Sequence, residues 1–162
     1  MSQDDKTVEI ISVSTENTME IGRFIGKGLQ DGDVVALSGE LGSGKTCFTG
    51  GLARGLGVDE KYRITSPTFT LINEYPARHR LYHFDVYRIS SYSELDDLGC
   101  EEYLGTEGVV VIEWAEKIKK ILPEKTVYID FEYVDENRRK MIIRASADRL
   151  NELIKDIKTE GV

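Results

Sequence analysis

Residues 39–46, with the sequence GELGSGKT, constrain the fold of this chain more than any other stretch of its sequence. They fit the phosphate-binding loop pattern G-x-x-x-x-G-K-[ST], which lies between a buried strand and the N-terminus of a helix. Residues 34–37 are typical of such a strand, and residues 47–56 are typical of the helix. The sequence therefore predicts a nucleoside triphosphate site; the alternative is a glycine-rich turn without a ligand.

The loop offers both backbone and side-chain groups to phosphate. Its glycines let N–H groups surround an anion, and the helix N-terminus adds a partial positive charge at the same point. Lys45 is expected to bridge the terminal phosphates, and the Thr46 hydroxyl is expected to reach Mg²⁺. The predicted nucleotide contacts within the loop are Glu40, Leu41, Gly42, Ser43, Gly44, Lys45 and Thr46.

Two acidic residues follow strand-like segments and could complete a metal site. Mg²⁺ at such a loop is held by the loop hydroxyl and by a carboxylate at the end of a nearby strand. Glu113 follows the apolar run 109–112, and Asp85 follows residues 81–84. If both act, one holds the metal directly, and the other binds a metal-bound water or orients the attacking water. The alternatives are that Glu113 caps the helix after Trp114 and that Asp85 forms a turn or pairs with Arg88.

A third candidate segment is SPTFT at residues 66–70. The hydroxyls of Ser66, Thr68 and Thr70 could sense the terminal phosphate, as a switch segment does when it becomes ordered around it. The alternative is a plain turn into an edge strand. His79 and His83 are interpreted as loop and strand residues rather than catalytic groups, whereas Trp114 could be core, a wall of the nucleotide site or part of a partner surface.

Alternation and helical spacing predict the other elements. Strands are expected at residues 7–13, 68–75, 80–87, 108–112, 126–134 and 140–145, with hairpins formed by 68–75 with 80–87 and by 126–134 with 140–145. Helices are expected after a cap at Ser14 or Thr15, with apolar spacing through residues 19–29, and at residues 115–122 and 148–158. Residues 90–103 are expected to form one or two short helices with a break near Gly99. The resulting fold class is α/β: a single P-loop NTPase domain over residues 1–162, with a central partly parallel sheet, antiparallel marginal strands and flanking helices. The nucleotide is expected at the carboxyl ends of the strands.

The bulk composition narrows the possible partners and compartment. A chain of 162 residues with 40% hydrophobic content is the size of one domain, and no apolar run or signal peptide marks it for a membrane or for export. A cytoplasmic protein is therefore expected, with Cys47 and Cys100 as reduced structural thiols. The net charge of −8 and the dispersed basic residues argue against direct binding to DNA or to another nucleic acid backbone.

Two missing features separate the classes of P-loop protein. The chain has no Asn-Lys-x-Asp segment for reading guanine, which favours an ATPase over a GTPase. It also has no arginine-rich lid of the kind that a small-molecule kinase closes over its acceptor. These features make phosphorylation of a small acceptor the less favoured output.

Four segments together resemble a known family. GELGSGKT at residues 39–46, SPTFT at 66–70, HFDVYR at 83–88 and Glu113-Trp114 occur in the order and spacing of the TsaE family, small bacterial ATPases of tRNA threonylcarbamoyladenosine synthesis. The resemblance covers nearly the whole chain. The phosphate-binding loop alone would not name a family, but the other three segments around it do.

The resemblance implies a P-loop ATPase that uses ATP and Mg²⁺, releases ADP, and acts with the partner proteins TsaB and TsaD. Together they form the threonylcarbamoyl group on N6 of adenosine 37 in tRNAs that read codons beginning with A, and ATP hydrolysis resets the complex. The tRNA would be met only indirectly, through that complex. Two other readings remain open: a nucleotide-gated binding module without essential hydrolysis, and a small-molecule kinase.

The resemblance also implies roles for individual residues. Lys45 would contact phosphate, Thr46 and Glu113 would hold Mg²⁺, Asp85 would be the second active-site acid, and Ser66 and Thr68 would lie beside the terminal phosphate. Further nucleotide contacts are implied near Thr15, at the start of the first helix, and at Arg138, after the late hairpin turn. Cys47 stands where the family usually has threonine, with little expected effect on the chemistry.

Overall fold

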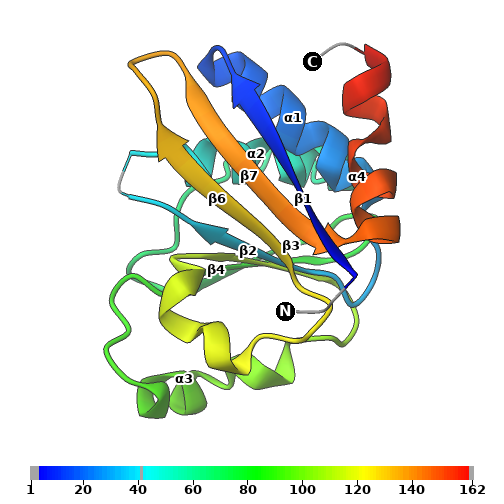
Figure 1. Cartoon of the computed structure of the whole chain (residues 1–162). Coiled ribbons are helices and arrows are strands. Elements are labelled where there is room, and N and C mark those ends of the chain that lie inside the picture. The colour runs from blue at the N-terminus through cyan, green and yellow to red at the C-terminus, as the bar shows by residue number, and fades with distance from the viewer. Residues whose placement is uncertain (1–3, 41, 161–162) are drawn as a thin grey trace.

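The computed structural model describes residues 4–40 and 42–160, which form one α/β domain around a mixed seven-stranded sheet (Figure 1). The strands are β1 (Asp5–Ser12), β2 (Val34–Ser38), β3 (Ile72–Tyr75), β4 (Leu81–Asp85), β5 (Val109–Glu113), β6 (Val127–Tyr133) and β7 (Arg139–Ser146). The α-helices are α1 (Thr15–Gly28), α2 (Lys45–Leu56), α3 (Tyr92–Leu98) and α4 (Ala147–Glu160), and two 3₁₀ segments are η1 (Cys100–Glu102) and η2 (Ala115–Ile121). None of the described helices is long and apolar enough to cross a membrane.

The sheet has a parallel centre and antiparallel margins, as the sequence predicts. Its strand order is β1-β7-β6-β2-β5-β4-β3. Strands β6, β2, β5 and β4 run parallel, whereas β7, β1 and β3 pair antiparallel with their neighbours. The central strands β2 and β5 are buried almost throughout because helices cover both faces, which is why their sequences are continuously apolar. The parallel register brings the carboxyl ends of β2, β4 and β5 to one edge of the sheet.

Each face of the sheet has its own apolar core. On one face, α1, α2 and α4 pack over alternate strand residues such as Leu37 and Val111. On the other face, α3, η1 and η2 pack over the intervening residues, such as Ala36 and Ile112. Because successive side chains of a strand point to opposite faces, the two cores follow from the alternation along each strand.

Helices α1 and α2 pack unusually closely because glycines replace side chains where they meet. A Cβ on Gly51 would lie 2.0 Å from the backbone oxygen of Met19, and a Cβ on Gly26 would lie 2.2 Å from that of Leu52. The close approaches occur at Gly22 and Gly26 in α1 and at Gly51 and Gly55 in α2. The two glycines of each helix are four residues apart and therefore lie on the same side of it. The two helices therefore run side by side, and their N-termini reach the same edge of the sheet.

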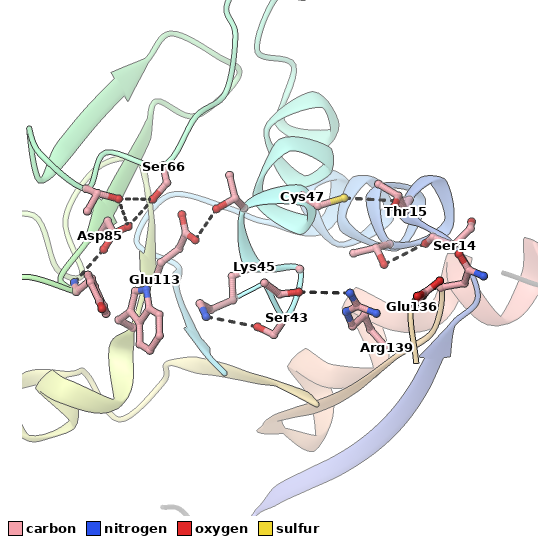
Figure 2. A pocket seen from close by; sticks show the side chains of 18 residues that line it. Ser14, Thr15, Ser43, Lys45, Cys47, Ser66, Asp85, Glu113, Glu136 and Arg139 are labelled. Atoms are coloured by element: carbon pink, nitrogen blue, oxygen red, sulfur yellow. Dashed lines mark hydrogen bonds between the residues drawn. The ribbon is translucent and has the colours of Figure 1, made fainter. Parts of the chain in front are cut away.

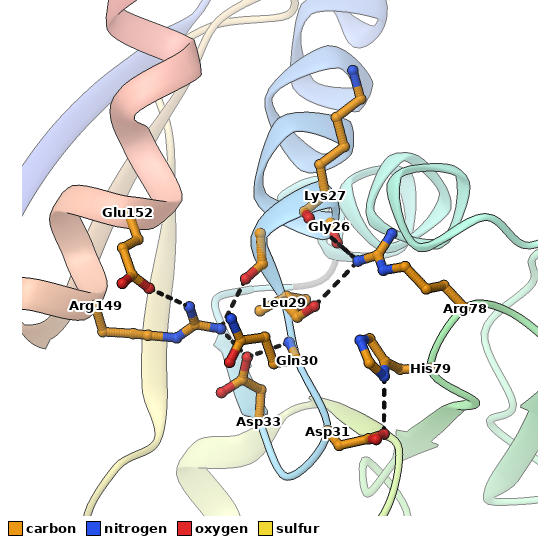
Figure 3. A network of polar contacts seen from close by, with 11 residues as sticks. Gly26, Lys27, Leu29, Gln30, Asp31, Asp33, Arg78, His79, Arg149 and Glu152 are labelled. Atoms are coloured by element: carbon orange, nitrogen blue, oxygen red, sulfur yellow. Dashed lines mark hydrogen bonds and ion pairs between the residues drawn. The ribbon is translucent and has the colours of Figure 1, made fainter.

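The opposite ends of α1 and α2 are held by one arginine from the turn between β3 and β4 (Figure 3). The guanidinium of Arg78 donates hydrogen bonds at 3.1–3.3 Å to four carbonyl oxygens, those of Gly26, Lys27, Leu29 and Gly55. The last carbonyls of a helix have no partner within the helix, and a cation also interacts favourably with that end of its dipole. Arg78 thus ties the carboxyl ends of both helices to the sheet edge.

Two elements differ from the sequence-based expectation. Residues 68–71 are not strand: Leu71 N donates to Pro67 O at 2.6 Å and Leu71 has a left-handed φ of 71°, so a turn precedes β3. Residues 115–122 form a 3₁₀ segment interrupted at Ile118 rather than an α-helix. Ala115 and Ile118 of this segment are buried in the second core.

Candidate functional site

A cavity of about 440 Å³ opens at the carboxyl edge of the sheet, beside the N-termini of α1 and α2 (Figure 2). Most of the predicted site residues line it: Thr15, Gly42, Ser43, Gly44, Lys45, Thr46, Ser66, Thr68, Asp85 and Glu113. Glu40 lies outside this lining, with an exposed side chain, and Leu41 falls outside the described residues. The cavity thus joins the loop, two strand ends and the SPTFT segment, which are far apart in the sequence.

The loop between β2 and α2 has a backbone that only glycine adopts easily. Gly39, Gly42 and Gly44 have φ of 142°, 79° and 107°, and a Cβ on Gly39 would lie 2.7 Å from the Phe131 carbonyl oxygen. Helix α2 begins at Lys45, and no side chain of the described residues caps it. Its first N–H groups are therefore directed into the cavity without a helical partner, which suits an anion.

Lys45 is buried, with 5% of its surface exposed, and its ammonium lies against the loop itself. Its Nζ donates to the carbonyl oxygens of Gly39 and, at 3.0 Å, of Glu40, and it sits 4.0 Å from the ring centroid of Trp114. Burial lowers the pKa of Lys45, and the carboxylates of Glu113, Glu116 and Asp85 act against that shift. The arrangement is a desolvated cation that is held in the loop by acceptors.

Glu113 ends β5 and reaches across to the start of α2. Its Oε1 accepts a hydrogen bond from Thr46 Oγ1 at 2.8 Å, and its Oε2 lies 2.5 Å from His83 Nε2. Glu113 as a whole is 2% exposed. Since it bonds to these two side chains, Glu113 does not cap η2, and Trp114 begins that segment with a left-handed φ of 64°.

Asp85 ends β4 directly beside Glu113 in the parallel register. Its Oδ2 accepts hydrogen bonds from the hydroxyls of Ser66 and, at 3.1 Å, of Thr68, and its Oδ1 accepts one from the Tyr87 backbone N–H at 2.9 Å. Asp85 therefore fastens the SPTFT segment to the sheet. The alternative pairing with Arg88 is not formed, because that guanidinium lies 4.6 Å from the ring centroid of Phe69.

The donor set of the cavity fits Mg²⁺ with a phosphate group. Mg²⁺ takes oxygen ligands and is usually held by one or two carboxylates together with phosphate oxygens. Thr46 Oγ1 and Glu113 Oε1 are two such oxygens at 2.8 Å from each other, and the loop N–H groups and Lys45 lie beside them. Both candidate ligand atoms are oxygens and neither is sulfur, so this pair suits a hard cation such as Mg²⁺.

Sequence reasoning missed several residues of the cavity. Arg139 lines it and donates to the Gly42 carbonyl at 3.3 Å, whereas the predicted Arg138 lies outside the lining and pairs with Asp135 at 2.7 Å. Arg138 belongs to the turn before β7, which begins at Arg139, so a shift of one position separates the surface arginine from the one that lines the cavity. Further lining residues are Ser14, Thr18, Tyr87, Glu136 and Asn137.

The sequence predicts His83 to be an ordinary strand residue, yet in the structure it contacts Glu113. A signal was present in the sequence. His83 precedes Asp85 by two positions in β4, so both side chains point to the same face of the sheet. The contact itself depends on the pairing of β4 with β5, which the sequence pattern does not specify.

The comparisons with known proteins agree with this arrangement. The family model "Threonylcarbamoyl adenosine biosynthesis protein TsaE" matches residues 12–141. The chain is 44% identical over 133 residues to the TsaE protein of Treponema pallidum, covering 82% of this chain and 97% of that protein, and 38% identical over 147 residues to that of Bacillus subtilis, covering 90% of each. The crystal structure of Bacillus subtilis YdiB superposes with a TM-score of 0.80 at 31% identity, over 99% of this chain and 100% of that one. The chain therefore belongs to the TsaE family of tRNA threonylcarbamoyladenosine biosynthesis proteins.

Proposed function

We propose that this protein is a Mg²⁺-dependent ATPase that acts with TsaB and TsaD in forming threonylcarbamoyladenosine on tRNA. The observation that carries the proposal is the convergence of Lys45, Thr46, Asp85 and Glu113 on one cavity at the carboxyl edge of the sheet. A phosphate-binding loop, a hydroxyl and two strand-end carboxylates are the groups that ATP hydrolysis at a P-loop requires. Membership of the TsaE family supplies the pathway.

In this proposal the two ends of the cavity have different roles. Figure 2 shows Asp85 and Glu113 on one side of Lys45, and Thr15, Glu136 and Arg139 on the other. The terminal phosphate would lie on the carboxylate side, and the nucleoside would lie toward Thr15 and Arg139. Thr46 and Glu113 would hold Mg²⁺, which supplies positive charge that neutralises the phosphate oxygens.

The residues of the chain would then act as follows. The Lys45 ammonium exchanges its bonds to the Gly39 and Glu40 carbonyls for bonds to phosphate, which is favourable because an ammonium bonds more strongly to an anionic oxygen than to a neutral carbonyl. Asp85 positions the attacking water once Ser66 and Thr68 turn from its carboxylate to the terminal phosphate. Hydrolysis by the isolated protein should be slow, and the partner proteins should accelerate it.

The decisive experiment is ATP hydrolysis by the purified protein, alone and with purified TsaB and TsaD. The proposal expects Mg²⁺-dependent release of phosphate that rises when both partners are present. Lys45→Ala should abolish nucleotide binding, and Lys61→Ala, which changes an exposed lysine outside the cavity, should not. Absence of both complex formation and stimulation would rule the proposal out. Transfer of labelled phosphate to a small acceptor would identify a kinase instead.

One observation favours a second candidate, a nucleotide-gated binding module in which hydrolysis is incidental. The SPTFT segment is fastened to Asp85 by Ser66 and Thr68 and could be released when the terminal phosphate offers them a new acceptor. The test is a Glu113→Ala variant that still binds ATP but does not hydrolyse it. Repeated rounds of tRNA modification with this variant would favour the binding module, and a single round would favour the ATPase.

A further inference from the structure

The buried His83 is a titratable side chain that the proposed chemistry leaves without a role. Its surface exposure is 0%, and it lies in the middle of β4, beside Val111 of β5 and Asn73 of β3 in the sheet register. Most core positions of the neighbouring strands are aliphatic. A histidine at such a position needs a polar partner, because an unpaired polar group is costly to bury.

That partner is Glu113. The carboxylate lies between two donors from different elements: Thr46 Oγ1 contacts Oε1 at 2.8 Å, and His83 Nε2 contacts Oε2 at 2.5 Å. A carboxylate that binds a metal is an acceptor, so in that form of Glu113 the donor of this hydrogen bond is His83 Nε2. The other ring nitrogen, Nδ1, is buried and has no hydrogen-bond partner among the described residues. Among the described residues, the contact with Glu113 is therefore the hydrogen bond that the imidazole of His83 makes.

The contact fixes how Glu113 is turned. A glutamate carboxylate rotates broadly about its last torsion, so a single bond to Thr46 would leave the second oxygen free to swing. The bond from His83 holds Oε2 on the core side and leaves Oε1 facing Thr46 and the cavity. Groups that orient a metal ligand in this way typically change metal affinity or activity by 10- to 100-fold when they are removed.

We propose that His83 is a positioning residue that holds the Glu113 carboxylate in the orientation required to bind Mg²⁺ beside Thr46. The inference rests on the proposed function, because it assigns His83 to the Mg²⁺ ligand of that site. His83 touches neither nucleotide nor metal in this account, and it acts through Glu113.

The first test compares variants that distinguish loss of the hydrogen bond between His83 and Glu113 from loss of packing in the core. His83→Phe keeps an aromatic ring and removes the donor, His83→Gln keeps an N–H donor, and Val111→Ala damages the same part of the core without touching Glu113. For each variant, calorimetry gives the affinity for ATPγS without Mg²⁺ and the Mg²⁺ concentration that half-saturates Mg²⁺-dependent ATPγS binding. Thermal unfolding shows that the variant is folded.

His83→Phe should raise the half-saturating Mg²⁺ concentration by about 10- to 100-fold while Mg²⁺-free affinity stays within twofold of wild type. His83→Gln should recover most of the loss, and Val111→Ala should lower the melting temperature without moving the Mg²⁺ requirement. If His83→Phe and Val111→Ala show the same Mg²⁺ requirement as wild type, His83 is only a core residue and the inference is overturned.

A second test needs neither metal nor nucleotide and is decisive even if His83→Phe does not fold. Imidazole ¹⁵N NMR of the metal-free wild-type protein should show His83 protonated at Nε2, with that proton shifted downfield by its short hydrogen bond and moved upfield in Glu113→Ala. Protonation at Nδ1 alone would overturn the inference. If wild type shows no Mg²⁺-dependent ATPγS binding, the proposed function fails, and the NMR result still decides whether His83 holds Glu113.

Discussion

A single methyl group added at Gly51 should separate α1 from α2 and weaken the nucleotide site. An ideal Cβ on Gly51 would lie 2.0 Å from Met19 O and 2.9 Å from Met19 Cα, and real Cβ atoms essentially never come within 3.0 Å of such atoms. The opposing atoms belong to the backbone, so no side-chain rotation relieves the clash. The helices must part by about 1 Å, which disturbs a tightly packed interface.

The size of the effect follows from a comparison with the neighbouring glycine. Gly50 lies in the same helix, and a Cβ there would meet nothing within 4 Å. Each alanine gains about 1 kcal/mol of helix propensity over glycine, so the difference between the two variants is the overpacking cost, about 1–3 kcal/mol. Gly50→Ala should therefore be more stable than wild type, and Gly51→Ala less stable than Gly50→Ala by that amount.

The assays are urea unfolding and thermal unfolding of both variants and their affinity for ADP. For a domain of this size the stability difference corresponds to about 2–12 °C in melting temperature. Gly51→Ala should also bind ADP several-fold more weakly, because Ser14 and Thr15 at the start of α1 line the cavity and would move away from the loop. Gly50→Ala should bind ADP as wild type does. Equal stability and equal ADP affinity in the two variants would refute the close-packing argument.

Three further predictions concern single side chains. Arg78→Ala should lower the free energy of unfolding by about 1–2 kcal/mol, the scale of a lost helix cap, because two helix ends lose their donors. Urea unfolding measures this, and full stability in Arg78→Ala would contradict it. Arg139→Ala should weaken ADP binding about 10-fold, as expected for a hydrogen bond to a charged group, whereas Arg138→Ala should leave it within twofold, because Arg138 pairs only at the surface. Calorimetry that found the reverse order would assign the contact to Arg138. Burial raises the pKa of the Cys47 thiol, with a further contribution from Glu16, so iodoacetamide should alkylate Cys47 more slowly than free cysteine at pH 8, and the rate should keep rising above pH 9 as more thiolate forms. Mass spectrometry follows the reaction, and alkylation of Cys47 faster than free cysteine at pH 8 would show that its thiol pKa is not raised.

Local patterns in the sequence were enough to predict much of the fold. The order of strands and helices, the break at Gly99 and the two hairpins depend on apolar spacing and turn residues, which short stretches of sequence carry. The first helix begins earlier than its apolar pattern, at Thr15, because Ser14 Oγ accepts a hydrogen bond from the Asn17 N–H at 3.0 Å and caps it. The sequence predicts a cap at Ser14 or Thr15, and the structure confirms it.

The errors occur where tertiary contacts override local preference. Residues 68–71 have the composition of a strand, but Ser66 and Thr68 bond to Asp85 and the segment turns instead. The residues of the cavity that the sequence predicts are those that belong to a recognisable motif or that directly follow an apolar run. The role of His83 depends on the pairing of β4 with β5, and the role of Arg139 depends on where the turn ends and β7 begins. Residue spacing in the sequence specifies neither of these.

The most direct test of the central claim is a crystal structure of this protein with a non-hydrolysable ATP analogue and Mg²⁺. We expect the phosphates to lie against the loop of residues 39–46 with Lys45 in contact, and Mg²⁺ to be bound by Thr46 Oγ1 and Glu113. Nucleotide bound elsewhere, or Mg²⁺ bound without either of these side chains, would contradict the account.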